Sequence, residues 1–208
     1  MQQTLFTVGH STHTLQHFFS LLKLHNITAL CDVRSKPYSR NNPQFNKEDL
    51  KTALSSQGIA YVFLGRELGA RSEDPTCYDD GKVQYDRLAR TDLFRDGLDR
   101  IQEGAKKYRI ALMCAEKEPL DCHRTILVAR HLQALGFEVQ HILADGELES
   151  HKDALDRLVH TFNLPAHDMF RTHEDVVEDA YRLQGERIAY DRGDVQDSQS
   201  STLKRAAG

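Results

Sequence analysis

The feature that most constrains this chain is the alternation of short apolar runs with segments of helical periodicity. Strand-like runs are expected at residues 5–8, 27–33, 59–64, 109–114 and 137–143. Strands that alternate with helices of ordinary length form right-handed crossovers, which give a mainly parallel sheet covered on both faces. The sequence therefore predicts an α/β fold, with about five strands in a mainly parallel sheet and helices on both faces.

Capping residues mark where the helices between these strands begin and end. Thr14 and Thr91 can each accept a backbone amide hydrogen bond at a helix start, and Asn46 opens a helix that Gly58 stops. Residues 65–84 show no periodicity and carry glycines, charges and a proline. We expect them to form a surface excursion that serves as a lid or a binding loop.

The length of 208 residues suits one domain with an appendage. We expect a single α/β domain over residues 1–190, with extra helices at about 152–162 and 174–184 packed on its outside. Residues 191–208 are rich in Asp, Ser and Gln, which predicts a disordered tail.

Composition excludes several classes of protein. The 27 lysines and arginines against 31 aspartates and glutamates leave a formal net charge of −4, so any bound anion must be held locally. The longest apolar runs fall far short of the roughly 20 residues that cross a bilayer, and no signal peptide is evident, so we expect a cytoplasmic protein with no membrane partner. The four cysteines are too sparse for a disulfide scaffold and are expected to be reduced.

Ligands of open parallel sheets bind beyond the carboxyl ends of the strands, and three such turns here are unusually polar. Gly9, His10 and Ser11 follow the first strand. Gly9 allows a tight turn, and the following amides lie near a helix N-terminus, which suits an anion. The alternative is a plain turn followed by a helix cap.

The second polar turn contains Asp32, Arg34, Ser39 and Arg40. A guanidinium group matches phosphate or carboxylate geometry, and Asp32 can orient it or act as a base. The alternative is a structural ion pair between Asp32 and Arg34.

The third polar turn is the most informative, because Cys114 ends a strand while Cys122, His123 and Arg124 begin the next helix, with Glu116 between them. The helix dipole and Arg124 favour a thiolate or a bound anion. A thiolate at Cys122 or Cys114, with His123 or His10 as the base, is one hypothesis. Small core cysteines within a salt-bridge network are the structural alternative.

A metal site made by Cys114, Cys122 and His123, with His10 as a further ligand, is another hypothesis, since zinc or iron prefers such donors. However, the sequence has no CxxC pair, and the adjacent side chains of Cys122 and His123 on one helix should point about 100° apart. We therefore rank metal binding below anion binding and predict no metal or other cofactor.

These turns resemble those of the bacterial family known as domain of unknown function (DUF) 488. The motifs that carry the resemblance are Thr7-Val8-Gly9-His10-Ser11, Asp32-Val33-Arg34-Ser35 with Pro37 and Ser39, Pro43-Gln44-Phe45-Asn46, Leu68-Gly69, and Met113-Cys114-Ala115-Glu116 with Cys122-His123-Arg124. They span about residues 7–146. The resemblance implies an α/β fold and a shared residue pattern, but it supplies no reaction.

We predict an enzyme that binds a small or nucleic-acid-derived anionic substrate in a pocket at the strand ends. The expected catalytic residues are Asp32, Cys114, Glu116, Cys122 and His123. The expected anion-binding residues are Gly9, His10, Ser11, Arg34, Ser39, Arg40 and Arg124. The alternatives are a non-catalytic nucleotide or nucleic-acid binding or sensor domain, and a metal-dependent hydrolase.

Overall fold

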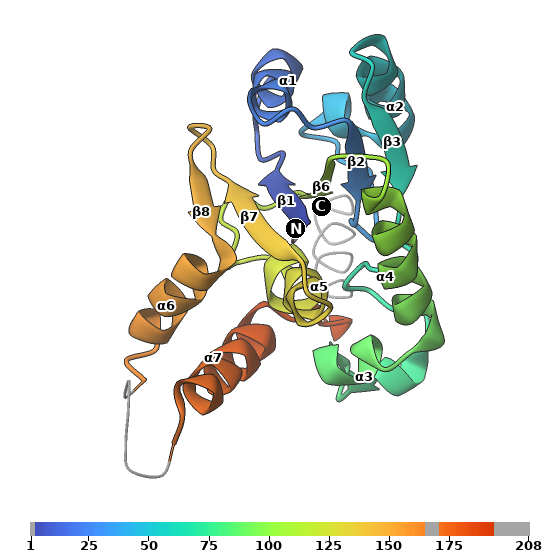
Figure 1. The fold of residues 1–208 in the computed structure, drawn as a ribbon. Helices are drawn as coiled ribbons and strands as arrows, with labels where there is room; N and C mark the ends of the chain where they lie inside the picture. The colour runs from blue at the N-terminus through green and yellow to red at the C-terminus, as the bar shows by residue number, and fades with distance from the viewer. Residues whose placement is uncertain (1–2, 165–170, 194–208) are drawn as a thin grey trace, which may run out of the picture.

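The computed structural model describes residues 3–164 and 171–193. Its main sheet has six strands in the order β3-β2-β6-β1-β7-β8 (Figure 1). Their bounds are β1 Thr4–Gly9, β2 Ala29–Asp32, β3 Ala60–Phe63, β6 Ile110–Cys114, β7 Glu138–Ile142 and β8 Leu148–Ser150. The first five strands in this order run parallel, and β8 pairs antiparallel with β7. The predicted α/β fold is confirmed, and β8 is a strand that the sequence analysis did not predict.

Helices cover both faces of this sheet, as expected (Figure 1). One face carries α1 (Leu15–Leu24) and α2 (Lys47–Ser56). A short 3₁₀ turn, η1 (Pro43–Phe45), precedes α2. The other face carries α4 (Asp92–Ala105) and the π-helical segment η3 (Arg124–Ala129), which continues as α5 (Arg130–Ala134). Outside η3 lie α6 (His151–Thr161) and α7 (His173–Ile188), the two additional C-terminal helices.

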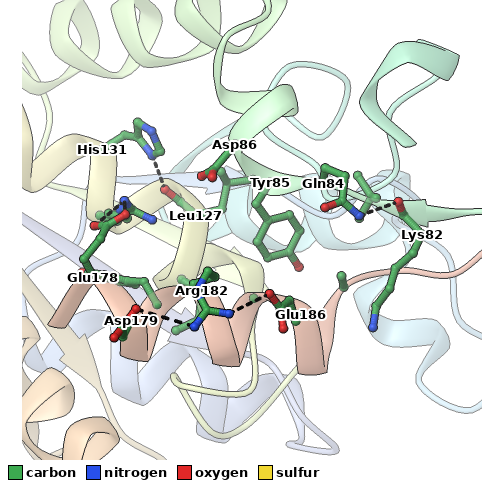
Figure 2. A pocket seen from close by; sticks show the side chains of 16 residues that line it. Lys82, Gln84, Tyr85, Asp86, Leu127, His131, Glu178, Asp179, Arg182 and Glu186 are labelled. Atoms are coloured by element: carbon green, nitrogen blue, oxygen red, sulfur yellow. Dashed lines mark hydrogen bonds and ion pairs between the residues drawn. The ribbon is translucent and has the colours of Figure 1, made fainter. Parts of the chain in front are cut away.

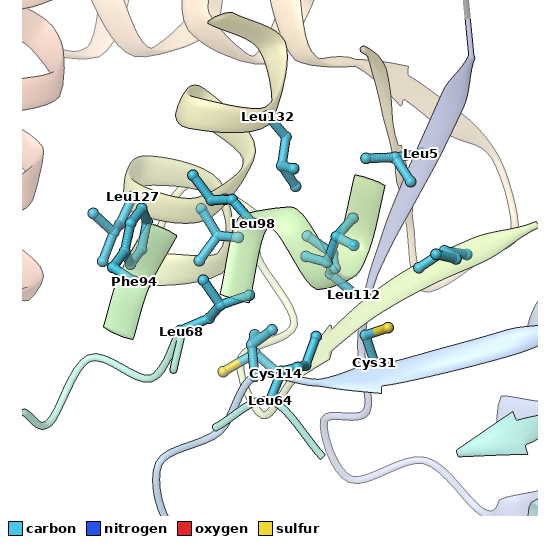
Figure 3. Packing of buried hydrophobic residues seen from close by; sticks show 14 of the residues in the cluster. Leu5, Cys31, Leu64, Leu68, Phe94, Leu98, Leu112, Cys114, Leu127 and Leu132 are labelled. Atoms are coloured by element: carbon cyan, nitrogen blue, oxygen red, sulfur yellow. The ribbon is translucent and has the colours of Figure 1, made fainter. Parts of the chain in front are cut away.

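The strands divide their apolar side chains between two cores because successive residues of a strand point to opposite faces. Leu5 and Leu112 pack with Leu98 of α4 and Leu132 of α5 (Figure 3). The opposite core contains Phe6, Val8, Phe18, Leu22, Leu50, Leu54, Ala111 and Met113. Each fully buried leucine or phenylalanine contributes about 1.5–3 kcal/mol of stability, so the two cores fix the sheet between its helices.

The predicted helix caps are observed at Thr14 and Thr91. The hydroxyl of Thr14 accepts the His17 amide, and that of Thr91 accepts the Phe94 amide. Asn46 does precede α2, but its side-chain oxygen accepts the amide of Ser39 instead of capping the helix. The asparagine therefore orders the loop before the helix.

The excursion at residues 65–84 contains a short turn, η2 (Pro75–Cys77), and a hairpin of β4 (Tyr78–Asp79) and β5 (Lys82–Val83), followed by α3 (Tyr85–Ala89). The C-terminal end of the described chain docks on this hairpin, where the backbones of Asp191 and Lys82 form an isolated antiparallel β-bridge. Of the predicted tail, residues 191–193 belong to this docked segment, and residues 194–208 lie outside the described residues.

Within residues 3–164 and 171–193, no helix is both long enough and apolar enough to span a membrane. All four cysteines belong to the described part of the chain and are free and buried.

Candidate functional site

The three polar turns meet at the carboxyl edge of the sheet because β6 lies between β1 and β2. Gly9 pairs with Cys114, and Asp32 pairs with Met113. A cavity of about 420 Å³ opens beside them. It is lined by Arg34, Ser35, Lys36, Ala70, Arg71, Tyr85, Cys114, Ala115, Glu116, Asp121, Cys122, His123, Arg187, Ile188, Ala189, Tyr190 and Asp191.

Asp32 and Arg34 form a buried ion pair at the end of β2. The Arg34 Nε and Nη2 groups donate to the two carboxylate oxygens of Asp32 at 2.9 and 2.7 Å. The Tyr61 hydroxyl donates to the same carboxylate at 2.8 Å, and Arg34 Nη2 also donates to the Phe45 carbonyl. Burial opposes the charge of Arg34, but its bonds to Asp32 raise its pKa. This is the structural ion pair that the sequence analysis held as the alternative.

His10 completes this network as a neutral group. Its Nδ1 donates to the Ser11 carbonyl at 2.8 Å, so its Nε2 accepts a hydrogen bond from Arg34 Nη1 at 3.0 Å. Burial and the adjacent Arg34 guanidinium lower the pKa of His10 to about 4. Both ring nitrogens are occupied, so His10 is available neither as the thiol's base nor as a metal ligand.

The turn after β1 is held against the third loop. The amides of His10 and Ser11 donate to the carbonyls of Cys114 and Ala115, each at 2.9 Å. A Cβ on Gly9 would lie 1.9 Å from the carbonyl oxygen of Glu116, so only glycine permits this close approach. The anion-binding role predicted for these two amides does not fit this geometry, because both already have backbone partners.

Three other predicted anion-binding residues also have different surroundings. Ser39 orders its own loop through its amide and its hydroxyl, and Arg40 is exposed, and neither of them lines the cavity. Arg124 is fully buried and its Nη1 donates to the Glu116 carbonyl at 2.7 Å. Arg124 therefore fixes the backbone of the loop beneath the cavity.

The remaining predicted residues gather at the floor of the cavity. His123 Nδ1 lies 3.7 Å from Cys114 Sγ and 3.9 Å from Cys122 Sγ, and Cys122 Sγ lies 2.9 Å from a carboxylate oxygen of Glu116. The Nε2 atom of His123 is 3.0 Å from the Val33 carbonyl, which can only accept. The hydrogen of a neutral His123 is therefore on Nε2, and its Nδ1 lone pair faces both thiols. We call Cys114, Glu116, Cys122 and His123 the thiol cluster.

The charges within the thiol cluster are strongly coupled. Burial alone would raise the pKa of Cys122, but the Cys114 thiol, the Arg124 guanidinium and His123 together lower it well below its ordinary value. Burial and Cys122 raise the pKa of Cys114 and that of Glu116. Burial opposes the charge of His123, yet its contact with Cys122 raises its pKa. A negative charge in the cluster therefore belongs mainly to Cys122.

One geometric expectation about this cluster was wrong. Cys122 and His123 were expected to diverge by about 100°, yet the donor atoms of Cys114, Cys122 and His123 all lie within 4.8 Å of one another. Cys122 lies in the bend that leads into the helical segment, so the angle between successive helical residues does not apply to this pair.

The rim of the cavity carries cations that the sequence analysis did not select. Lys36, Arg71 and Arg187 are exposed and line the cavity, and none of them forms an ion pair with a carboxylate of the described ranges. Arg71 stacks on the Tyr190 ring at 4.4 Å from its centroid. More than a hundred residues separate Arg71 from Arg187 in the sequence. Their proximity depends on docking of the C-terminal segment, for which no local sequence signal exists.

A second hollow of about 150 Å³ lies between η3, α7 and the β4–β5 hairpin (Figure 2). Five of its charged groups form ion pairs with one another. Arg182 of α7 pairs with Asp179 and Glu186 at 3.6 and 3.1 Å, and Glu178 of the same helix pairs with Arg130. Tyr85 lines this hollow as well as the larger cavity. The larger cavity is the better candidate site because two cysteines and a histidine lie together there beside three cations that pair with no carboxylate of the described ranges.

Two other buried histidines, His141 and His151, form a network that does not line the cavity. His141 Nδ1 lies 2.8 Å from the Thr7 hydroxyl, His141 Nε2 lies 3.0 Å from His151 Nδ1, and His151 Nε2 lies 2.7 Å from the Tyr181 hydroxyl. Burial lowers the pKa of His151 to about 4 and that of His141 well below its ordinary value. Both are core histidines whose ring nitrogens have hydrogen-bond partners.

Fold and site together define an α/β protein with a thiol and imidazole cluster at the carboxyl edge of a parallel sheet. A family model described as "Domain of unknown function DUF488" matches residues 14–131, and the chain belongs to that family. The match includes the thiol cluster and the Asp32–Arg34 pair, whereas Arg187 and the docked C-terminal segment lie beyond it. Neither the curated proteins nor the solved structures that were compared contain a match.

Proposed function

We propose that this protein is an enzyme that acts on a small substrate bearing a phosphate or carboxylate group. The observation that carries the proposal is the cavity itself. The thiol cluster lies at its floor, and its rim carries three cations that form no ion pair within residues 3–164 and 171–193. Perturbed titratable groups that converge in a cavity are typical of active sites. The volume of about 420 Å³ suits a small molecule or a single nucleotide-sized group.

Substrate binding in this proposal depends on Lys36, Arg71 and Arg187. Arg34 and Arg124 are held by other partners, so their contribution is to position the loops and to add positive field. Arg71 and Arg187 come from segments far apart in the sequence and line the same cavity, where their guanidinium groups can bind one anionic group. Because the chain has a net charge of −4, this local cluster of cations is what selects an anion.

Reaction in this proposal occurs at the cavity floor, where the thiol cluster supplies sulfur, imidazole and carboxyl groups within contact distance of one another. Such a set can transfer protons and can bind or attack an electrophilic centre. The thiols must be reduced for this role, so the proposal includes a reducing compartment such as the cytoplasm.

Alkylation by two reagents of similar size tests the proposal. Iodoacetate is anionic and iodoacetamide is neutral, so the rates at which each modifies Cys114 and Cys122, relative to free cysteine, report the selectivity of the cavity. We expect chelator-treated protein to favour iodoacetate by roughly tenfold, because electrostatic focusing in a cleft raises local anion concentration by about that factor or more. Peptide mass spectrometry after timed quenching gives the rate at each cysteine.

The Arg71→Ala and Arg187→Ala variants should lose this preference, and the matched Arg40→Ala variant should keep it, since Arg40 is exposed but does not line the cavity. Equal selectivity for the two reagents in the unaltered protein would overturn the proposal, and so would failure of both reagents to reach either cysteine. Saturable binding of an anion without turnover, unaffected by Cys→Ser changes, would instead indicate a sensor domain.

A further inference from the structure

The donor atoms of the thiol cluster have the separations of a metal site. Zinc lies about 2.3 Å from sulfur and about 2.0–2.1 Å from nitrogen, so neighbouring sulfur and nitrogen donors of a tetrahedral site are about 3.5 Å apart. His123 Nδ1 is 3.7 and 3.9 Å from the two sulfur atoms, and all three donors lie within 4.8 Å of one another. We propose that Cys114, Cys122 and His123 bind a zinc-type divalent cation. This inference rests on the proposed function and names the cofactor of the same site.

The imidazole of His123 is oriented as metal-bound histidines are. Such a histidine donates its second ring N–H to a carbonyl or a carboxylate, which fixes the tautomer and directs the other nitrogen at the metal. Here Nε2 of His123 donates to the Val33 carbonyl at 3.0 Å, and Nδ1 faces the two sulfur atoms. The backbone of β2 thus holds the histidine in the orientation that the cation requires.

The sulfur atom of Cys122 has matching support from the backbone. The amide of Arg124 approaches it at 3.4 Å, and a hydrogen bond of this kind stabilises a coordinating thiolate. Cys114 and Cys122 are 3 and 1% exposed. Two thiolates and one divalent cation sum to zero charge, so the cation removes the cost of burying two anionic sulfur atoms.

Glu116 lies beside the three donors without belonging to their group. Its carboxylate oxygen is 2.9 Å from Cys122 Sγ, and Glu116 lines the cavity together with the three donors. Catalytic zinc sites have three protein ligands and one position open to substrate, whereas structural sites are closed by four. Three protein donors beside a cavity match the catalytic type. A bound cation would there polarise an oxygen atom of an anionic substrate, and Glu116 would be placed to exchange a proton beside it.

Spacing in the sequence concealed this site. The two cysteines are eight residues apart, one at the end of β6 and the other before η3, so no CxxC pair exists. The strand and the helical segment bring them together only in the folded chain.

Cobalt substitution tests the inference on the full chain. After removal of endogenous metal by a chelator, the protein is titrated with Co²⁺ and its spectrum is followed for thiolate charge-transfer bands and for the visible bands of tetrahedral cobalt. We expect both sets of bands to saturate at about one Co²⁺ per chain. The Cys114→Ser, Cys122→Ser and His123→Ala variants should each weaken binding by more than about 100-fold, the upper end of the loss caused by removing an outer partner.

Cys31→Ser and Cys77→Ser are the matched controls, because both cysteines are buried and free but lie outside the cluster. A second measurement needs no variant, so it holds even where a substitution prevents folding. Added Zn²⁺ should slow iodoacetamide modification of Cys114 and Cys122 in the unaltered protein by at least about tenfold.

Cobalt spectra without thiolate bands, or binding unaffected by the cluster variants, would overturn the metal site. Absence of protection by Zn²⁺ would do the same. The iodoacetate preference is measured on metal-free protein, so it can survive this failure and leave a metal-independent enzyme. Conversely, loss of that preference with intact cobalt binding would leave a metal centre but remove the anionic substrate.

Discussion

Two buried polar clusters occupy the same edge of the sheet and differ in how completely their groups are satisfied. At the end of β2, Arg34 donates to both carboxylate oxygens of Asp32, and Tyr61 and His10 occupy the remaining directions. At the end of β6, the thiol cluster lines a cavity, and the donor atoms of its two cysteines and its histidine lie within 4.8 Å of one another. The comparison shows that polar residues at strand ends can be fully occupied by one another, so only the thiol cluster keeps donor atoms with which to bind a ligand.

Removal of one partner from the buried cluster around Asp32 and Arg34 should have the largest effect on the free energy of unfolding. We expect Asp32→Ala to lower the free energy of unfolding by about 3–5 kcal/mol, because it leaves the buried Arg34 cation uncompensated. Urea denaturation followed by circular dichroism measures this loss. Glu103→Ala is the control, since its pair with Lys106 is exposed and should contribute less than about 1 kcal/mol. A loss below about 1 kcal/mol for Asp32→Ala would refute the structural role assigned to the pair.

The network of His141 and His151 is saturated like the Asp32 cluster, but it is neutral, so acid should break it. The folded state holds the pKa of His151 at about 4, below the ordinary value of 6.5, so the unfolded chain binds protons first as pH falls. The contribution of His151 to the free energy of unfolding should therefore be fully present above about pH 6.5. It should decline by about 3 kcal/mol as the pH falls toward 4.

Urea denaturation at a series of pH values checks this slope. His151→Gln should reduce the slope by the share of one histidine, since His10 and His141 also have lowered pKa values and keep the rest. The exposed His160→Gln should leave the slope unchanged. A slope that is identical in the His151→Gln variant and the unaltered protein would assign the acid sensitivity to other groups.

Gly9 connects the two strand-end clusters, and its substitution should have an intermediate effect. A Cβ at this position meets the Glu116 carbonyl at 1.9 Å, so Gly9→Ala must displace the loop that carries the thiol cluster. We expect a loss of about 1–3 kcal/mol, typical of overpacking, together with slower alkylation of Cys122. Gly58→Ala is the control because its φ of +72° strains the backbone while nothing lies within 4 Å of the added Cβ. Equal alkylation rates in the two variants would show that the loop does not depend on Gly9.

Local signals in the sequence predicted most of the fold. The five parallel strands and the caps at Thr14 and Thr91 followed from periodicity and capping, which act within a few residues. The two hairpins were missed although both carry Asp-Gly turns, at Asp80-Gly81 and Asp145-Gly146. β4 and β5 are two residues long and β8 is three residues long. Strands this short cannot show an alternation of apolar and polar residues.

The sequence could predict which residues of the candidate site lie at the same edge of the sheet, but not which of them already have partners. The rule that parallel strands end at one edge predicted Cys114 and Asp32 at the same edge of the sheet. That their strands are neighbours is known only from the structure. Sequence could not show that Arg34 is already occupied by Asp32, because saturation depends on the folded positions of Tyr61 and His10. It could not select Arg187 either, because that residue reaches the cavity through docking of a distant helix.

The thiol cluster should contribute little to folding. Its substitution should therefore have the smallest effect on the free energy of unfolding, in contrast with substitution of Asp32. Cys122→Ser keeps the size and hydrogen-bonding capacity of the side chain, so we expect metal-free protein to lose only about 1 kcal/mol. The same change should abolish Co²⁺ thiolate spectra from the Cys122 sulfur and the anion-selective alkylation at this position. Urea denaturation of metal-free Cys122→Ser beside Asp32→Ala makes the comparison directly. Groups that bind a ligand stabilise the folded chain mainly when the ligand is bound. If Cys122→Ser lowers the free energy of unfolding as much as Asp32→Ala does, the thiol cluster is a structural part of the core.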